Sequence, residues 1–177
     1  MPKRKHQKFN RPKKIFDIAL IKGENALIKK YGLKNRREVW KANFAIGKIR
    51  NLAKELILAS ETEKNQFIER QAKKGFAVTS IADILGLGKE DYLKRRLESI
   101  VVAKKFAKTH KQARQMIVHR HVLMNGNVIN SPAHLTTIEE EANLSVTFDI
   151  PKEKVISDEE KDILKQMNHS HKNGEEK

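Results

Sequence analysis

Residues 109–132 read THKQARQMIVHRHVLMNGNVINSP, a pattern that predicts a helix leading directly into a β-hairpin. Thr109 and Gln112 have the spacing of a helix-capping pair, and apolar residues follow at intervals of three and four. Asn125 and Gly126 lie between apolar residues and favour a type I′ turn, because both central positions of that turn need positive φ. The stretch therefore predicts the centre of a small α+β domain.

The segments on either side extend this domain. Residues 90–103 gather leucine, isoleucine and valine on one helical face. The charged residues of this helix are placed away from that face: Lys94, Arg95 and Glu98 opposite it, and Arg96 at its boundary. The helix of the opening stretch is expected to end near His119, and residues 144–150 alternate as a half-covered strand does. The order predicts two helices packed on a small antiparallel sheet over residues 91–150.

Residues 17–90 predict a small helical domain. Gly32 marks the end of a first short helix, and Asn35 with Glu38 predicts the start of a long amphipathic one. Further helices are expected after Ser60 and near Ser80, because short hydroxyl side chains cap a first turn. The core of this domain is expected to include three aromatic residues: Trp40, Phe44 and Phe67.

The charge of the chain is large and unevenly placed. Lys and Arg number 37 against 22 Asp and Glu, which gives a formal net charge of +15. Residues 1–16 form a basic extended arm with too few apolar residues to fold alone, and residues 151–177 form an acidic tail that we expect to be flexible. Basic zones at residues 1–60 and 91–135 indicate a polyanionic partner.

Several classes of function are excluded by what the sequence lacks. Cysteine is absent, so disulfides and cysteine-rich zinc sites are excluded. No apolar run approaches the roughly 20 residues of a membrane span, and no secretory signal is visible. Phosphate-binding loops, dinucleotide fingerprints and nucleophile elbows are also missing. We therefore expect a cytoplasmic protein that is not an enzyme, binds no membrane and uses no metal or cofactor.

Two parts of the sequence resemble a known family. The first is YGLKNRREVW (31–40), and the second runs from ILGLGKEDYLKRRLESIV (84–101) through the opening stretch. They are similar to small-subunit ribosomal protein S four in its archaeal and eukaryotic form, and the second part resembles its S-four RNA-binding domain. The similarity spans about residues 9–150.

The resemblance implies a structural constituent of the small ribosomal subunit. Such a protein binds ribosomal RNA directly, helps to nucleate subunit assembly and lies near the messenger entry path. The implied partners are small-subunit ribosomal RNA and neighbouring ribosomal proteins, with messenger RNA as a further candidate. Some bacterial relatives bind zinc through N-terminal cysteines, which this chain lacks, so no metal is expected.

The candidate RNA-binding residues are basic or short polar side chains. By position, the resemblance assigns this role to Lys34, Asn35, Arg36, Arg37, Arg96, Thr109, Lys111, Arg114, Gln115, His119, His121 and Asn125. Charge and place in the chain add Lys3, Arg4, Lys5, Lys8, Arg11, Lys13, Lys14, Lys41, Arg95, Lys105, Lys108, His110 and Arg120. Three positions depart from the family, where glycine is common at Lys105 and Arg120 and a basic residue at Ala103, so differently shaped loops are expected.

The helix that begins after Thr109 suggests how RNA would be bound. Lys111 and Arg114 lie one turn apart and could bracket adjacent phosphates, while the helix N-terminus exposes backbone N–H groups. Replacing Arg114 by alanine should then remove about one phosphate contact from the salt dependence of binding. The histidines lack a companion carboxylate cluster, and we interpret them as polar RNA contacts or solvated side chains.

Three other functions are kept as alternatives. A ribosome-assembly factor built on the same domain would bind precursor ribosomal RNA and then leave. An RNA-modifying enzyme such as a pseudouridine synthase would need a catalytic domain longer than 177 residues can supply. A basic DNA-binding architectural protein would bind duplex DNA and ribosomal RNA alike. The helical part with its YGLKNRREVW motif favours the ribosomal protein.

Overall fold

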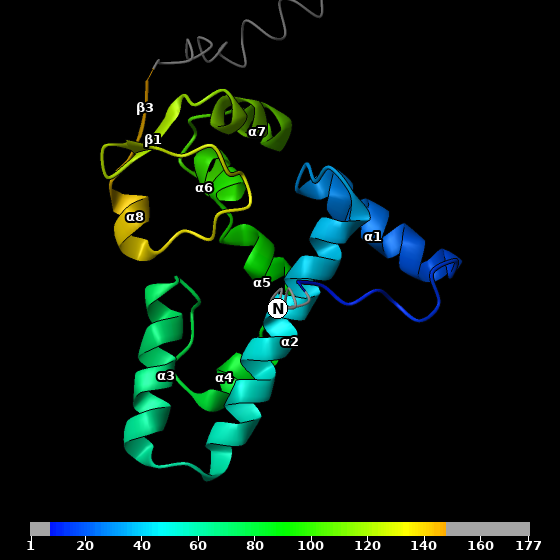
Figure 1. The fold of residues 1–177 in the computed structure, drawn as a ribbon, viewed down its shortest axis with the longest axis vertical. Coiled ribbons are helices and arrows are strands. Elements are labelled where there is room, and N and C mark those ends of the chain that lie inside the picture. Colours follow the sequence, from blue (N-terminus) through cyan, green and yellow to red (C-terminus); the bar gives the residue numbers. More distant parts are fainter. Residues whose placement is uncertain (1–7, 148–177) are drawn as a thin grey trace, which may run out of the picture.

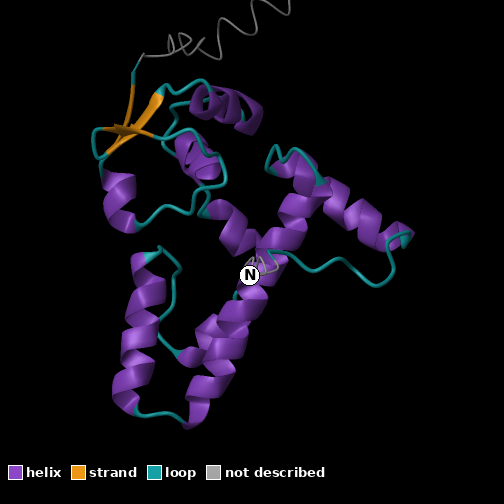
Figure 2. Cartoon of the chain, in the orientation of Figure 1, coloured by secondary structure: helices purple, strands orange, loops and turns teal. Residues whose placement is uncertain are grey.

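The computed structural model describes residues 8–147, which form an α+β structure of helices with one small sheet (Figures 1 and 2). The helices are α1 (Ile18–Lys30), α2 (Arg36–Glu55), the 3₁₀ turn η1 (Leu56–Leu58), α3 (Glu61–Lys73), α4 (Ile81–Gly86), α5 (Lys89–Lys94), α6 (Leu97–Ala103), α7 (His110–Val118) and α8 (Ile138–Ala142). The strands are β1 (Val122–Met124), β2 (Asn127–Val128) and β3 (Leu144–Val146). The expected fold class is confirmed. Lys3, Arg4, Lys5 and the acidic tail lie outside the described residues.

The long helix α2 organises the helical part. In Figure 1 it runs along the longest axis, with α1 joined to one end and α3 to the other, and α4 and α5 pack against it. One apolar cluster joins α1, α2 and α5, and another joins α2, α3 and α4. Of the three aromatic residues expected in the core, Phe67 is buried, whereas Trp40 and Phe44 are only half-buried.

Four of the described helices, α2, α3, α4 and α7, begin at the predicted capping residues. The hydroxyl of Ser60 accepts a hydrogen bond from the N–H of Glu63, and the side chain of Ser80 caps α4 in the same way. Asn35 precedes α2 as predicted, but its side chain makes no capping hydrogen bond to the described residues. Instead, Glu38 accepts a hydrogen bond from the backbone N–H of Lys34, so the turn before α2 is fixed by a carboxylate.

The single helix predicted over residues 90–103 is wrong, because it is divided into α5 and α6 at Arg95 and Arg96. Arg96 has extended backbone angles, φ −70° and ψ 145°. The Arg95 carbonyl accepts the N–H of Thr136, and the N–H of Leu97 donates to the carbonyl of His134. A distant extended segment thus supplies these hydrogen bonds in place of the helix, and the break turns charged side chains inward.

A second core lies between α6, α7 and the sheet. The strand order is β2-β1-β3, all antiparallel. Asn125 and Gly126 have φ of 51° and 79°, so the predicted turn geometry, with positive φ at both positions, is confirmed. α7 ends at Val118, as expected. α8 was not predicted, and the residues of the predicted strand beyond Thr147 lie outside the described part of the chain.

The two cores meet at α5 and α6. Leu93 of α5 packs with the α1–α2 cluster, whereas Leu97 of α6 packs with the second core. The predicted division of the chain between residues 90 and 91 stays a prediction, and this packing groups α5 with the helical part. No helix within residues 8–147 is long and apolar enough to cross a membrane.

Candidate nucleic-acid interface

The turn between α1 and α2 lies against the first turn of α7. Gly32 has φ +60°, and a Cβ at this residue would lie 2.7 Å from the Cβ of His110. Only glycine combines that backbone conformation with so close an approach. The rings of Tyr31 and His110 are 5.8 Å apart. This contact brings Lys34, just after the turn, and Lys111, in the first turn of α7, into one region of the molecule.

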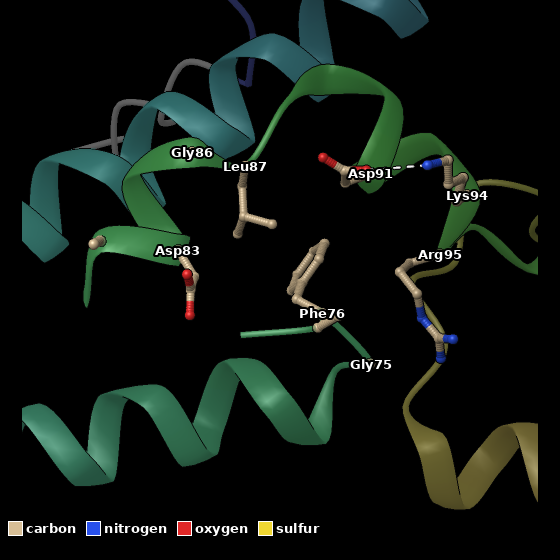
Figure 3. A pocket seen from close by; sticks show the side chains of 10 residues that line it. Gly75, Phe76, Asp83, Gly86, Leu87, Asp91, Lys94 and Arg95 are labelled. Carbon is tan, nitrogen blue, oxygen red and sulfur yellow. Dashed lines mark hydrogen bonds and ion pairs between the residues drawn. The ribbon is translucent and has the colours of Figure 1, made fainter. Parts of the chain in front are cut away.

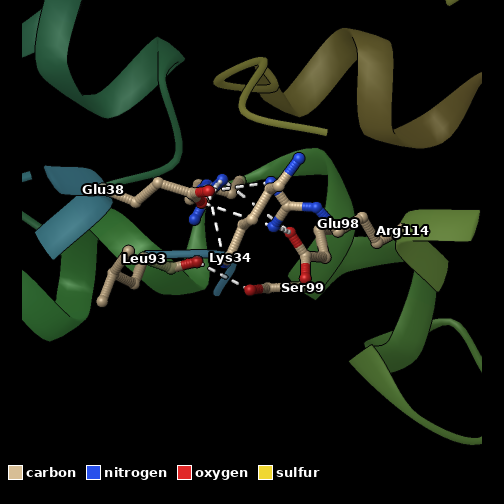
Figure 4. Close-up of polar contacts among 7 residues, drawn as sticks. Lys34, Glu38, Leu93, Glu98, Ser99 and Arg114 are labelled. Carbon is tan, nitrogen blue, oxygen red and sulfur yellow. Dashed lines mark hydrogen bonds and ion pairs between the residues drawn. The ribbon is translucent and has the colours of Figure 1, made fainter. Parts of the chain in front are cut away.

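Behind this region, two glutamates and two arginines form a network of ion pairs (Figure 4). Arg96 Nη2 donates to Glu38 Oε2 at 2.7 Å, and Arg114 Nη2 donates to Glu38 Oε1 at 2.8 Å. Arg114 Nη1 also reaches Glu98 Oε2 at 3.4 Å. The network connects α2, α6 and α7, and therefore ties the helical part to the second core.

The two carboxylates of the network have opposite pKa shifts. Burial alone would raise the pKa of Glu38, but hydrogen bonds from Arg114 and Arg96 outweigh burial and hold that pKa below its ordinary value. Burial raises the pKa of Glu98 to about 7, against the opposing charges of Arg96 and Arg114. The difference follows from geometry, because Glu98 has longer contacts with the arginines and its Oε1 has no hydrogen-bond partner among the described residues.

Arg95 is also held inside the protein. Its guanidinium donates to the carbonyls of Lys74 and Thr136, each at 3.0 Å, and to the carboxylate of Glu141 at 2.7 Å. It lies against Gly75, where a Cβ would collide with it. The expectation that Arg95 faces outward was therefore wrong. Arg96, whose side chain is 4% exposed, is buried for the same reason, since both are neutralised by distant parts of the chain.

An open hollow of about 570 Å³ lies beside Arg95 (Figure 3), and the two carboxylates in its lining already have hydrogen-bond partners. Asp83 receives hydrogen bonds from Thr79 and Ser80, and the backbone N–H of Thr79 contributes most to lowering the pKa of Asp83 to about 2. Asp91 accepts the N–H of Gly88 and pairs with Lys94. Both carboxylates are thus occupied in capping helices.

Most of the other candidate RNA-binding residues within residues 8–147 are at the surface. The exposed ones are Lys8, Arg11, Lys13, Lys14, Lys34, Asn35, Arg37, Lys41, Lys105, Lys108, Thr109, Lys111, Gln115, His119, Arg120 and Asn125. The half-buried ones are Arg36, His110, Arg114 and His121. Arg114 is committed to Glu38 and Glu98, and burial lowers the pKa of His110. The structure therefore divides the candidates into surface residues and internal ion-pair partners.

Within the described residues, the chain segment that contains α7 carries charged side chains of one sign. The sequence contains no Asp or Glu between Glu98 and Glu139. The nearest carboxylates on the other elements, Glu38 and Glu98, are turned into the ion-pair network. Lysines and arginines at the start of α2 and around α7 therefore have few acidic neighbours, which is the electrostatic arrangement of a polyanion-binding surface.

Two of these basic residues have left-handed backbone conformations. Lys105 follows α6 with φ 62°, and Arg120 follows α7 with φ 65°. A residue with a Cβ loses roughly 1–2 kcal/mol in this conformation relative to right-handed ones, and glycine does not. Lysine and arginine at these two positions therefore cost stability locally.

Comparisons with known proteins bear on the whole of this arrangement. Residues 95–141 match the S4 domain family. Small ribosomal subunit protein uS4 of Korarchaeum cryptofilum is 39% identical over 145 residues, covering 78% of this chain and 87% of that protein. The same protein of Methanothermobacter thermautotrophicus is 34% identical over 161 residues, covering 88% and 94%. The chain belongs to the uS4 family. The resemblance inferred from sequence motifs is thereby confirmed.

The S4 segment of this uS4 chain makes up most of the unit built on the second core, and β3 lies just beyond its end. The segment covers α6, α7, the hairpin and α8. Its first and last residues, Arg95 and Glu141, are the ion pair described above. The uS4 proteins named above are ribosomal proteins by name, and no enzyme is among them.

The four histidines within residues 8–147, His110, His119, His121 and His134, all lie in the S4 segment. The rings of His119 and His121 lie 6.4 Å apart and are nearly parallel. His134 Nε2 lies 3.3 Å from a carboxylate oxygen of Glu140. Within residues 8–147, no three histidine, aspartate or glutamate side chains are placed to share a metal ion.

Sequence reasoning missed the internal role of two acidic residues. Glu38 was interpreted only as a helix-capping residue and Glu98 as part of an outer face, although both are counter-ions of Arg96 and Arg114. Their partners are up to 76 residues away in the chain, so no local pattern indicates the pairing. The start of α8 had a visible signal, since Thr137 and Glu140 form a capping box.

Proposed function

We propose that this uS4 chain is a structural protein of the small ribosomal subunit and that it binds ribosomal RNA directly. The name shared by its relatives supports a place in that subunit. The observation that carries the RNA-binding proposal is the basic region where the α1–α2 turn meets α7. Cations from two distant segments gather there, while the nearby glutamates are occupied internally.

The contacts with RNA in this region would be mainly to the backbone. A-form RNA hides its base edges in a deep groove, so proteins bind it through phosphates and 2′-hydroxyls. Lys34 and Arg37 at the start of α2, with Lys108 and Lys111 at the start of α7, supply cations for phosphates. The N-terminus of α7, capped by Thr109, adds backbone N–H groups with a favourable helix dipole. Arg95 and Arg96 are left out because they are internal.

The architecture supports a role in assembly. The ion-pair network fixes the helical part against the second core, so cations on the two parts keep a constant relative position. A rigid surface with two basic parts can hold two RNA segments in a defined geometry, which favours early binding that helps to nucleate folding of the RNA. A location near the messenger entry path and contacts with neighbouring ribosomal proteins belong to the same proposal.

The proposal is tested by titrating the purified protein against the 5′ domain of small-subunit ribosomal RNA, with transfer RNA and duplex DNA as competitors. Preference for ribosomal RNA by several orders of magnitude, with a salt slope that indicates many phosphates, is the expected result. Equal binding of all three polyanions would overturn it. Co-purification with precursor subunits alone, and not with mature subunits, would indicate a transient assembly factor instead.

A further inference from the structure

The turn that leads into α1 exposes an aromatic ring. Phe16 is 89% exposed, and Ile18 at the start of α1 is 68% exposed. The other aromatic residue of this described arm, Phe9, is half-buried, with its ring 6.1 Å from that of Trp40. One arm aromatic therefore packs onto the helical part, and the other contributes little to the fold.

The charges around Phe16 are almost all positive. Lys13 and Lys14 are exposed and, with Phe16, line an open hollow of about 570 Å³. Asp17 also lines the hollow, but its carboxylate accepts the backbone N–H of Ala19 as the cap of α1. The ring thus projects from a cationic segment whose nearest carboxylate is occupied by the helix N-terminus.

We infer that Phe16 stacks on an unpaired base of the RNA, with Lys13 and Lys14 on the flanking phosphates. An unpaired nucleotide joins an apolar aromatic face to an anionic backbone, which is the chemistry that this segment complements. A protein partner would need an apolar pocket with an acidic rim. The experiment below distinguishes contact with such a protein from contact with RNA. The inference rests on the proposed RNA-binding function.

The position of this site makes it a separate anchor. In Figure 1, the chain enters α1 at the end of that helix farthest from the α1–α2 turn. A base bound at Phe16 would therefore lie one helix length away from the phosphates bound near α7. Stacking is nearly independent of salt, whereas phosphate contacts are not, so the two kinds of contact can be measured separately.

The experiment measures binding of the full chain to the 5′ domain of small-subunit ribosomal RNA across several salt concentrations. Phe16→Ala should weaken binding by about 5- to 150-fold, the range for loss of one stacked base, with an unchanged salt slope. Phe16→Trp should retain affinity, and its added fluorescence, beyond that of Trp40, should be quenched by RNA. Leu58→Ala is the matched control, because Leu58 is 96% exposed at the opposite tip between α2 and α3, and it should leave binding unchanged.

Phe16→Leu separates stacking from simple apolar contact and should bind as poorly as Phe16→Ala. Wild-type affinity in Phe16→Leu, or in Phe16→Ala, would overturn the inference. RNA binding that is intact in Phe16→Ala while incorporation into subunits falls would assign the ring to a protein contact, and would also overturn it. Failure of the wild-type protein to prefer ribosomal RNA over transfer RNA would instead contradict the proposed function.

Discussion

Replacing Arg114 by alanine should lower the free energy of unfolding of the protein. The salt dependence of RNA binding should change little. Arg114 donates to Glu38 at 2.8 Å and to Glu98 at 3.4 Å, and its side chain is only 24% exposed. Glu38 would keep Arg96, but Glu98 would keep only the contact with Arg96 at 3.8 Å. Removing one partner from an ion pair with limited exposure costs about 2–4 kcal/mol.

Urea denaturation of the two proteins measures this cost. In thermal denaturation, the same cost should appear as a fall in Tm of about 5–15 °C for a chain of this size. The loss of unfolding free energy should be larger at pH 8 than at pH 5. At pH 8 Glu98 is ionised, and without Arg114 it lacks part of the positive charge that favours this form. Arg114→Lys keeps the charge but not the fork that reaches two carboxylates, so it should recover only part of the loss.

The control is Lys111→Ala on the exposed side of the same helix. Its effect on the free energy of unfolding should stay within about 0.5 kcal/mol. The magnitude of its salt slope for RNA should fall by about 0.7–0.9, as expected for one lost phosphate contact. The slope for Arg114→Ala should stay close to that of the wild type. A slope reduced by about one in Arg114→Ala, with unchanged stability, would refute the assignment of Arg114 to the ion-pair network.

Three more predictions follow from individual residues. Lys105→Gly and Arg120→Gly should each raise the free energy of unfolding by about 0.5–1 kcal/mol, because they relieve a left-handed conformation, yet each should reduce the RNA salt slope; loss of stability would contradict this. Glu98, with a pKa of about 7 in the folded state, contributes stability below its unfolded pKa near 4.5 that is lost as the pH rises to about 7. Denaturation from pH 4 to 8 should show up to about 3 kcal/mol of this loss in the wild type and none of it in Glu98→Gln. Gly32→Ala should destabilise the protein by about 1–3 kcal/mol. Gly23 has open space around it, so Gly23→Ala should stabilise the protein slightly. Equal effects of the two substitutions would count against the close packing of α7 on the α1–α2 turn.

The features that sequence predicted well are those fixed by neighbouring residues. Helix starts at Ser60 and Thr109 and the hairpin turn at Asn125 depend on hydrogen bonds or backbone angles within four residues. The break between α5 and α6 could not be predicted in this way. It depends on the segment around Thr136, about 40 residues further along the chain, whose backbone pairs with Arg95. Periodicity reports which side of a helix is apolar, but not whether a distant strand replaces the helix.

The same limit explains why charge alone does not separate surface cations from internal ones. Counting arginines treats Arg95, Arg96 and Arg114 as equal to Lys111, although carboxylates from other elements neutralise the three arginines and leave the lysine exposed. Long side chains with several donors suit internal ion pairs, since the guanidinium can bridge two carboxylates in fixed geometry. A surface contact with phosphate can also be made by the single mobile charge of a lysine ammonium.

The internal ion pairs and the exposed cations both affect the stability of the free protein. The internal arginines remove Glu38 and Glu98 from the surface, which leaves the cations around α7 to repel one another in the free protein. The left-handed conformations of Lys105 and Arg120 also lower the stability of the free protein locally. A polyanion that binds this surface relieves the repulsion without changing the left-handed backbone. Binding to the folded state alone must then raise the apparent stability with RNA concentration, and it should do so more strongly at low salt, where both the repulsion and its relief are largest.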